Sequence, residues 1–347
     1  MYVGRNKKFF KAKKKNCNKK LIYSLKLLFF LFIVLIIFIK IEIAQEIKTK
    51  ISNLFPEHSY KYLSCFCGIA NAENIYARDL IEYYINIGVE KFYLGDNNLK
   101  NSEKLIDVLY DYVDNGTVEI IDLIGKPKYN NFQTDFYGYV YNKHKSKCNW
   151  MMFFDFDEFL YFKDNNTNAT TYLSNEKFKK CEIIKINWLI YDDNDLLYYE
   201  NKKIYERFIR PNYEDDSNIF VKSIVKGNIF GPIWTINGSP HIPNTRKKLC
   251  NSIGEKIKNN KVIIRPPIFQ ESYIKHFRYK SAEEYALKAI RGYPYKSNYN
   301  DFIKSFFTHN KFSKEKLEIF EKILNVTFPE YHNKSNINDY KDFNFIE

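Results

Sequence analysis

The sequence predicts an α/β fold in which a mostly parallel sheet is covered by helices on both faces. Between residues 62 and 154, short β-prone apolar runs alternate with segments whose apolar residues recur at helical spacing. Acidic clusters follow two of these runs, and such sheets bind ligands beyond the carboxyl ends of their strands. The chain is 45% hydrophobic and 18% aromatic, which is enough for a large buried core.

The first half of the chain contains strands and helices in alternation. Ser102 indicates the N-terminal cap of one helix, while Gly88 and Asn115-Gly116 indicate where two helices end. The predicted elements are, in order, a strand over 62–70, a helix over 74–88, a strand over 89–94, a helix from Ser102 to Gly116, a strand over 117–122, a helix over 132–145 and a strand over 150–154.

The second half of the chain is less regular. A strand is predicted over 183–191, followed by mixed short strands and loops over 194–267. Ser281 and Glu284 have the spacing of a capping box and predict a helix that runs to about Arg291. Ser313 predicts the cap of a last helix, with apolar residues at helical spacing behind it.

The first fifty residues predict a membrane anchor. Eight lysines precede an apolar stretch over 21–44, whose uninterrupted centre is flanked by Lys26 and Lys40. These two lysines can reach the interfaces, so that the stretch attains the roughly 20 residues that a span needs. The positive-inside rule then leaves the 1–20 tail in the cytosol and places the body in the lumen of the ER or Golgi, behind a stem over 45–60. A cleaved signal peptide is the alternative, although no small-x-small cleavage site follows closely.

The positive charge of the chain belongs to this tail. The formal net charge is +13, but the first fifty residues hold 13 of the 54 basic residues and only 2 of the 41 acidic ones. The remainder therefore carries 41 basic and 39 acidic residues and is nearly neutral. Since a protein that binds a phosphate backbone needs an excess of positive charge, we exclude a nucleic-acid partner.

A lumenal body would permit disulfides and N-glycans. Five of the six cysteines lie in the body, so that they cannot all pair within the chain, and the sequence does not fix which ones do. Sequons for N-glycosylation are consistent with a location in the lumen. They occur at Asn115, Asn165, Asn168, Asn237, Asn325 and Asn333.

The acidic cluster after the fourth strand carries the strongest functional signal. Asp155 and Asp157 are two residues apart. In an extended segment their side chains lie on the same face and can bind the same ion. Their oxygens suit Mg²⁺ or Mn²⁺, which can bridge a diphosphate leaving group. A solvated acidic turn is the simpler alternative. Phosphatases with an aspartate nucleophile also contain this motif, but they have Thr or Val at the position where this chain has Phe159.

Several ordered blocks resemble glycosyltransferase family 92 and related family-2-like enzymes. The opening block runs from Asn71 to Asn98 and the metal block from Trp150 to Leu160. The departures are Gly95, where a larger residue often stands, and Ala72-Glu73 in place of a simple Asn-Glu pair. The later blocks are Lys222-Ser-Ile-Val-Lys226, Ser239-Pro-His241, Cys250-Asn-Ser-Ile-Gly254 and the segment from Ile274 to Gly292.

The resemblance implies a Rossmann-type GT-A fold over 61–330, followed by a C-terminal tail over 331–347. It implies a nucleotide-sugar donor, a UDP-sugar by expectation, with Mn²⁺ or Mg²⁺, and transfer of a hexose to a glycan or glycosylated acceptor. Asp155, Asp157 and His276 are the implied metal ligands, and His276 is expected near the aspartates. The donor-binding residues are expected to be Asp155, Asp96, Glu73, Glu82 and Lys280, with His241 on the acceptor side and the N-terminus of the Ser281 helix facing the diphosphate.

The catalytic base remains open among Glu158, Asp192, Asp193 and the acidic run Glu214–Asp216. The resemblance also implies that Asp157 and His241 belong to the catalytic site. For Glu82 the alternative is a carboxylate that anchors a helix. Two alternatives for the whole protein are a microbial transferase for surface polysaccharide and a membrane-anchored protein that binds glycans without catalysis.

Overall fold

The computed structural model of the chain describes residues 29–46, 60–124, 132–229, 239–241, 243, 248–258, 261–291 and 299–332. These residues belong to two units, one before and one after the boundary between Ser59 and Tyr60. The predicted tail over 1–20, residues 21–28 of the predicted anchor, residues 47–59 of the stem and residues 333–347 lie outside the described residues.

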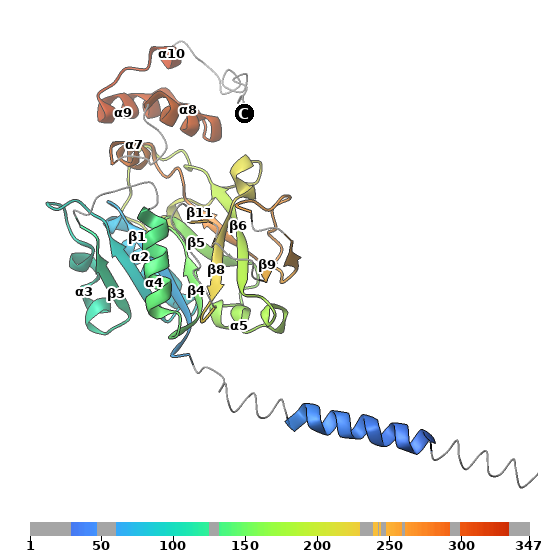
Figure 1. Cartoon of the computed structure of the whole chain (residues 1–347). Coiled ribbons are helices and arrows are strands. Elements are labelled where there is room, and N and C mark those ends of the chain that lie inside the picture. The colour runs from blue at the N-terminus through green and yellow to red at the C-terminus, as the bar shows by residue number, and fades with distance from the viewer. Residues whose placement is uncertain are drawn as a thin grey trace, which may run out of the picture. The chain divides into compact units, whose positions relative to one another are not determined.

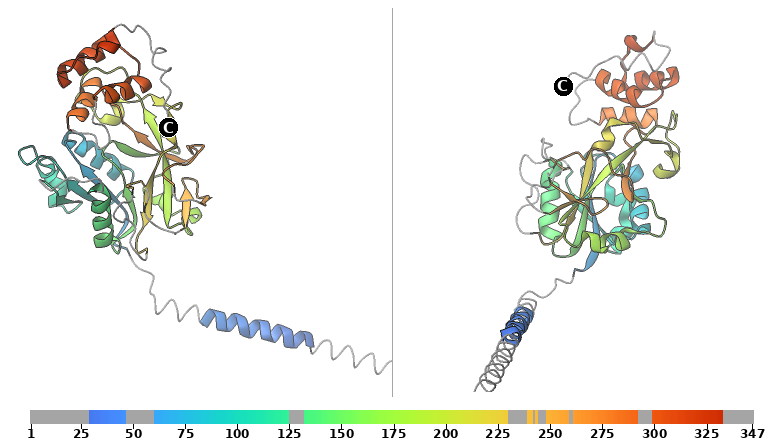
Figure 2. Two further views of the ribbon diagram at one scale, coloured as in Figure 1. Left: turned by 45° about the horizontal axis from the view of Figure 1, so that its top comes forward. Right: turned by 90° about the vertical axis from the view of Figure 1, so that its right-hand side faces the viewer.

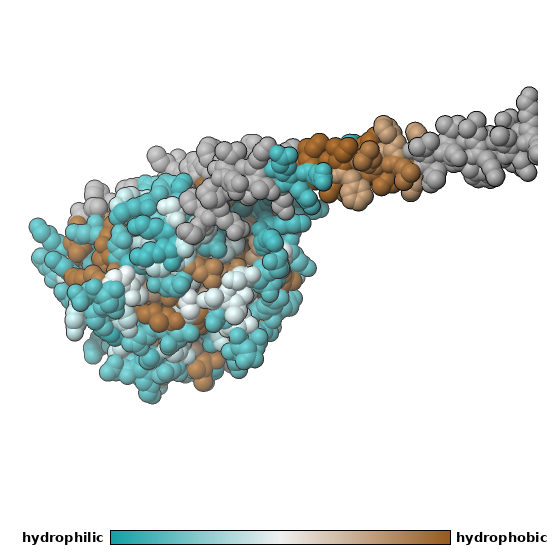
Figure 3. All heavy atoms as spheres, turned by 90° about the horizontal axis from the view of Figure 1, so that it is seen from below, coloured by the Kyte–Doolittle hydropathy of each residue, from teal (hydrophilic) through white to brown (hydrophobic). Residues whose placement is uncertain are grey.

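The described part of the N-terminal unit is a helix over 29–46. Its apolar side chains are exposed, Phe29 and Phe38 among them, and Figure 3 shows this helix as a nearly continuous hydrophobic surface. None of the helices in the described ranges is both long enough and apolar enough to cross a membrane.

The body contains a central sheet whose first four strands are parallel, as predicted. β1 lies between β2 and β4, and β3 pairs with the other edge of β2 (Figure 1). The strand predicted over 62–70 matches β1 at both ends. These strands are β1 (Tyr62–Ala70), β2 (Lys91–Asp96), β3 (Val118–Asp122) and β4 (Cys148–Phe153).

The second half of the sheet is mixed, which corrects the expectation of a mostly parallel sheet. β8 is antiparallel to both β4 and β6, and therefore β6 has the same direction as β4. β11 pairs with β6 in parallel and with β5 in antiparallel orientation. The further strands are β5 (Glu158–Phe162), β6 (Ile183–Tyr191), β7 (Pro211–Asn212), β8 (Val221–Lys226), β9 (Leu249–Asn251), β10 (Lys256–Ile257) and β11 (Ser272–His276).

Helices cover both faces of the sheet, as predicted, because each strand carries apolar residues on both sides. Leu80 and Tyr84 of α2 pack in the larger core cluster with Phe66 of β1. Tyr137 and Tyr141 of α4 lie in the second cluster, on the other side of the sheet. The helices of this half are α2 (Asn74–Asn86), α3 (Leu105–Asp114), α4 (Phe132–His144), α5 (Ala169–Leu173) and α6 (Ile204–Arg207).

Four further helices follow the last strand and gather beyond one end of the sheet (Figures 1 and 2). Ser281 caps the first of them with Glu284 in the predicted capping box, and Ser313 caps the third. The predicted last helix is followed by one more short helix. The four are α7 (Ala282–Ile290), α8 (Tyr299–His309), α9 (Lys314–Leu324) and α10 (Pro329–His332).

The predicted cap of α3 is wrong. Lys104 occupies the cap position instead of Ser102, and the first helical N–H, that of Leu105, donates to Asp96 Oδ2 at 2.7 Å. The carboxylate at the end of β2 thus takes over a bond that a capping side chain would otherwise supply. Gly95 leaves no room for a larger residue, since Leu123 and Phe136 fill the space where its Cβ would stand.

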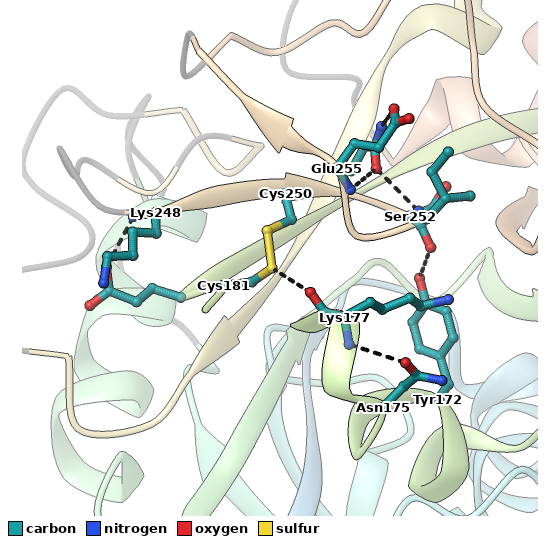
Figure 4. Close-up of a disulfide and its surroundings, with 11 residues drawn as sticks. Tyr172, Asn175, Lys177, Cys181, Lys248, Cys250, Ser252 and Glu255 are labelled. Carbon is teal, nitrogen blue, oxygen red and sulfur yellow. Dashed lines mark hydrogen bonds between the residues drawn. A yellow bond between two sulfur atoms is a disulfide. The ribbon is translucent and has the colours of Figure 1, made fainter. Parts of the chain in front are cut away.

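Two disulfides join segments that are far apart in the sequence. Cys65 in β1 is bonded to Cys148 in β4, and Cys181 before β6 is bonded to Cys250 in β9 (Figure 4). Cys67 is a free, buried thiol. Four of the five cysteines of the body therefore form disulfides, and one remains a thiol. An odd number of cysteines in the body requires at least one to remain unpaired within the chain.

Candidate active site

The candidate site begins where β4 ends, at the carboxyl edge that β4 shares with β1, β2 and β6. The chain turns sharply there, because the Glu158 N–H donates to the Asp155 carbonyl at 3.1 Å. Asp155 and Asp157 therefore belong to a tight turn between β4 and β5, and not to the extended segment that the sequence suggested. The turn gives the two carboxylates different partners.

Asp155 is held by groups from both sides of the sheet. The buried Lys222 of β8 donates to Oδ2 at 2.7 Å, and Gln133 of α4 donates to Oδ1 at 2.6 Å. Burial alone would raise the pKa of Asp155, but the Lys222 ammonium outweighs this effect and lowers it below the ordinary value. The side chain of Asp155 retains 35% exposure, which leaves it accessible to a ligand.

Asp157 is more deeply buried and faces two lysines from the last part of the fold. Its Oδ2 accepts from Lys288 of α7 at 3.0 Å and from Lys280 at 3.4 Å. Burial would raise the pKa of Asp157, but these ammonium groups hold it well below its ordinary value. Its other oxygen, Oδ1, lies 3.6 Å from Nε2 of His276.

The position of His276 agrees with the sequence-based expectation. β11 inserts between β5 and β6, so that His276 lies opposite Glu158 on one side and Ile190 on the other. This pairing brings the imidazole to Asp157 across a long sequence separation. Burial lowers the pKa of His276, and its Nδ1 has no hydrogen-bond partner among the described residues.

Glu158 directly follows Asp157 in the chain and is fully buried. Its Oε2 accepts the Asp155 N–H at 2.8 Å and lies 3.4 Å from Lys222, while Oε1 has no partner in the described residues. Burial raises the pKa of Glu158 well above its ordinary value. Glu158 therefore supports the turn by accepting the Asp155 N–H from below the surface of the site.

His241 lies beside Asp155 on the side of β8. Its Nδ1 donates to the Val221 carbonyl at 3.1 Å, which leaves Nε2 as the unprotonated nitrogen. Its own carbonyl accepts from Lys185 at 2.9 Å and from Ser223 at 3.1 Å. Burial lowers the pKa of His241 to about 3, so that its ring is neutral at physiological pH.

Glu73 lies close to this site through a buried ion pair. Arg291, which caps α7, donates to the Glu73 carboxylate at 3.0 Å and to the Asn71 carbonyl at 2.6 Å. Lys280 has a positive φ of 60° and places its ammonium 4.6 Å from the centre of the Tyr76 ring. The segment after β1 is thereby joined to the C-terminal end of α7, and the residue before Ser281 is joined to α2.

Asp96 lies at the same edge, at the end of β2, but both of its oxygens have partners. Oδ1 accepts from the backbone and side chain of Asn98, and Oδ2 accepts the first N–H of α3. A nucleoside contact by Asp96 remains a prediction, and in this structure its carboxylate shapes the loop after β2.

Three of the candidate residues have partners away from the two aspartates. Glu82 pairs with Lys203 at 2.9 Å, which matches its alternative role as an anchor of a helix. Asp193 pairs with Lys316 of α9 at 2.6 Å, and Asp192 pairs with Arg210 at 3.0 Å. Asp193 thereby joins α9 to the end of β6, while Asp192 joins the end of β6 to the segment before β7. Their catalytic roles remain untested predictions.

The N-terminus of α7 differs from the expectation. The Ala282 and Glu283 N–H groups donate to the carbonyls of Leu196 and Leu197, and the Glu284 N–H donates to the Ser281 hydroxyl. The first-turn N–H groups that would bind a diphosphate thus have partners already. α7 contributes to the site through Lys288 instead.

The side chains fit a divalent cation only in part. Within the described ranges, no group of three or more His, Cys, Asp or Glu side chains surrounds one ion position. Asp157 Oδ1 and His276 Nε2 lie side by side and combine an oxygen with an imidazole nitrogen, a donor set that suits Mn²⁺. Asp155 can join them only by releasing one of its present partners. Such sites are commonly completed by substrate phosphates.

Sequence reasoning missed several residues of the site. Lys222 and Lys288 are the closest cations to the aspartates, and Gln133 bonds Asp155, yet none has a local signature. Lys222 opens one of the blocks that resemble the family, but the sequence alone assigns no role to it. The partners of the other two depend on contacts between distant segments.

Comparisons with known proteins identify related sequences. The model of glycosyltransferase family 92 matches residues 60–322. A family 92 protein of Arabidopsis thaliana is 29% identical over 118 residues, which are 31% of this chain and 18% of that protein. A second one, of Oryza sativa subsp. japonica, is 25% identical over 112 residues, which are 30% of this chain and 17% of that protein. The matched segments thus span less than a fifth of the length of these relatives.

Among solved structures, TarS of S. aureus matches with a TM-score of 0.31 and 8% identity, over 71% of this chain and 43% of that chain.

Proposed function

The chain belongs to glycosyltransferase family 92 and is a glycosyltransferase, and we propose that it moves a hexose from a nucleotide sugar to a glycan at the site around Asp155 and Asp157. The observation that carries this proposal is the cluster of three lysines on the two aspartates, at the carboxyl edge of the sheet. This is the edge at which open α/β sheets bind their ligands.

The charges of the cluster suit an anionic leaving group. The carboxylates of Asp155 and Asp157 face the ammonium groups of Lys222, Lys280 and Lys288. Lys280 and Lys288 share the single carboxylate of Asp157, so positive charge is in excess on that side of the cluster, and buried charges interact more strongly than charges in water. A nucleoside diphosphate would be attracted to this excess, and Lys280 and Lys288 would bind its oxygens.

A divalent cation is part of the proposal. Asp157 and His276 would hold it, with Asp155 as a third ligand once the substrate is bound. When bound, Mn²⁺ or Mg²⁺ would stabilise the charge that develops on the leaving diphosphate. Lys222 would then balance the remaining charge of Asp155.

An inverting transfer also needs a base for the acceptor hydroxyl, and we assign this role to His241. Its Nδ1 is held by the Val221 carbonyl, so that Nε2 carries the lone pair of the ring. Glu158 is fully buried, while Asp192 and Asp193 are bound to cations elsewhere. Burial lowers the pKa of His241 to about 3, and the nearby Asp155 carboxylate acts in the opposite direction and would stabilise the imidazolium that forms on proton transfer.

We place the body in the lumen of the secretory pathway, behind a type II anchor over 21–44. Two features support this placement. The body carries two disulfides, which form and persist in oxidising compartments. The helix over 29–46, which includes residues 29–44 of the proposed anchor, exposes apolar side chains along its length.

A screen of nucleotide sugars with Mn²⁺ tests the proposed function. We expect the wild-type chain to hydrolyse or transfer one sugar, and both chelator and Asp155→Asn to abolish this activity. Binding of a nucleotide sugar without any turnover would favour the non-catalytic, glycan-binding alternative. Full turnover by Asp155→Asn would show that the sugar is transferred at another site.

A further inference from the structure

Trp188 lies in the wall of the candidate site, on β6. Its ring centre is 4.4 Å from that of His276 and 5.2 Å from that of His241. Phe220 packs against it at 5.5 Å. Trp188 therefore separates the proposed metal ligand from the proposed base, and its side chain is only 8% exposed.

The indole N–H of Trp188 has no hydrogen-bond partner among the described residues. A buried Trp normally finds a partner for this group, because an unpaired donor loses its water without compensation. The neighbouring His276 also has a buried nitrogen, Nδ1, without a partner in the described part of the chain. Two unpaired polar groups in contacting rings indicate that a polar ligand belongs beside them.

The two carboxylate oxygens of Asp157 face different side chains, and these side chains suit different groups of a ligand. Its Oδ2 faces the ammonium groups of Lys280 and Lys288, which suit phosphate oxygens. Its Oδ1 faces His276, and the ring of Trp188 packs against that imidazole. The indole N–H is a neutral donor, and its chemistry matches the oxygen of a neutral hydroxyl better than that of a phosphate.

We infer that the indole N–H of Trp188 donates a hydrogen bond to a hydroxyl oxygen of the sugar that the enzyme binds. The inference rests on the proposed function and adds to it a residue that recognises the sugar. The hydroxyl can belong to the donor sugar or to the acceptor glycan, and kinetics with each substrate distinguishes the two.

The test uses Trp188→Phe in the full chain, because this change keeps an aromatic ring and removes only the N–H and part of the indole. We expect kcat/KM to fall roughly tenfold through KM for one of the two substrates, as for the loss of one hydrogen bond. The melting temperature should be unchanged or higher, because an unpaired buried donor has been removed from the free protein. Tyr141→Phe, which removes the hydroxyl of a buried aromatic residue in α4 that bonds Lys226 and Ile229, is the control and should leave both KM values unchanged.

Deoxy analogues of the affected substrate identify the partner. Trp188→Phe should not weaken binding of the analogue that lacks the recognised hydroxyl, although it weakens binding of every other analogue. An unchanged KM for both substrates, or a fall in melting temperature without a change in KM, would assign Trp188 a purely structural role and overturn the inference. A wild-type chain that binds neither nucleotide sugar nor glycan would instead overturn the proposed function, and the inference with it.

Discussion

Asp155 and Asp157 differ in their surroundings, although only one residue separates them. Asp155 is partly exposed and bonded to one buried lysine, whereas Asp157 is buried and bonded to two. The sequence identified both aspartates as site residues, because paired carboxylates after a buried strand are a local pattern. A solvated acidic turn was the simpler alternative, and the burial of Asp157 against two lysines does not agree with it.

The two aspartates therefore predict different results on substitution. Asp155→Asn should lower kcat by roughly 100-fold or more, with little loss of stability, because Lys222 keeps the Glu158 carboxyl as a second partner at 3.4 Å. Asp157→Asn should also destabilise the fold by about 3–5 kcal/mol, since Lys280 and Lys288 lose their only carboxylate among the described residues. Activity assays and urea unfolding on both variants measure this. Equal stability of the two variants would contradict the account.

The buried Lys185 predicts a specific dependence of stability on pH. Burial lowers its pKa from 10.5 to about 7. Between these values the unfolded chain holds a proton that the folded chain has released, so this group makes stability rise as pH increases from 7 to 10.5. Lys185→Met should lack that rise and should be more stable than the wild type near pH 6, by up to a few kcal/mol.

Urea unfolding of wild type and Lys185→Met at pH 6, 7.5 and 9 measures the difference. The same variant should reduce activity, because Lys185 holds the carbonyl of His241. Parallel pH curves for the two proteins would refute a lowered pKa of Lys185.

At the scale of elements, local patterns located most strands and helices. The strand over 183–191 and the capping box at Ser281 were predicted as they are found, because each depends only on neighbouring residues. The antiparallel direction of β8 and the insertion of β11 between β5 and β6 depend on contacts between distant segments. Periodicity carries no information about such pairings, so the mixed sheet and the lysine cluster were not predicted.

The disulfide from Cys181 to Cys250 should stabilise the junction of β6 and β9. It closes a loop between residues 69 positions apart, and replacing both cysteines with Ala should cost about 2–5 kcal/mol of unfolding free energy. Cys67→Ala removes a buried thiol but no bond, and it serves as the control, with a smaller expected loss. Thiol titration of the unfolded, unreduced chain should find two free thiols, Cys17 and Cys67. Six free thiols would show that neither bond forms.

At the scale of the whole molecule, the proposed lumenal address predicts which sequons carry glycans. Asn115, Asn165 and Asn325 are exposed and should be modified in a eukaryotic host. Asn168 should not be, because its side chain caps α5 by accepting the Thr171 N–H. Site-resolved mass spectrometry measures the occupancy. A chain without glycans at any of these sites would contradict the lumenal placement.

The central claim is that Asp155, Asp157 and His276 form one donor site when a nucleotide and a metal are present. Anomalous diffraction from crystals grown with Mn²⁺ and a nucleoside diphosphate tests it most directly. We predict one Mn²⁺ peak at roughly 2.0–2.2 Å from Asp157 and His276, with the diphosphate between this ion and the ammonium groups of Lys280 and Lys288. A nucleotide bound with its diphosphate elsewhere on the sheet, or a Mn²⁺ ion without contact to either Asp157 or His276, would contradict the account.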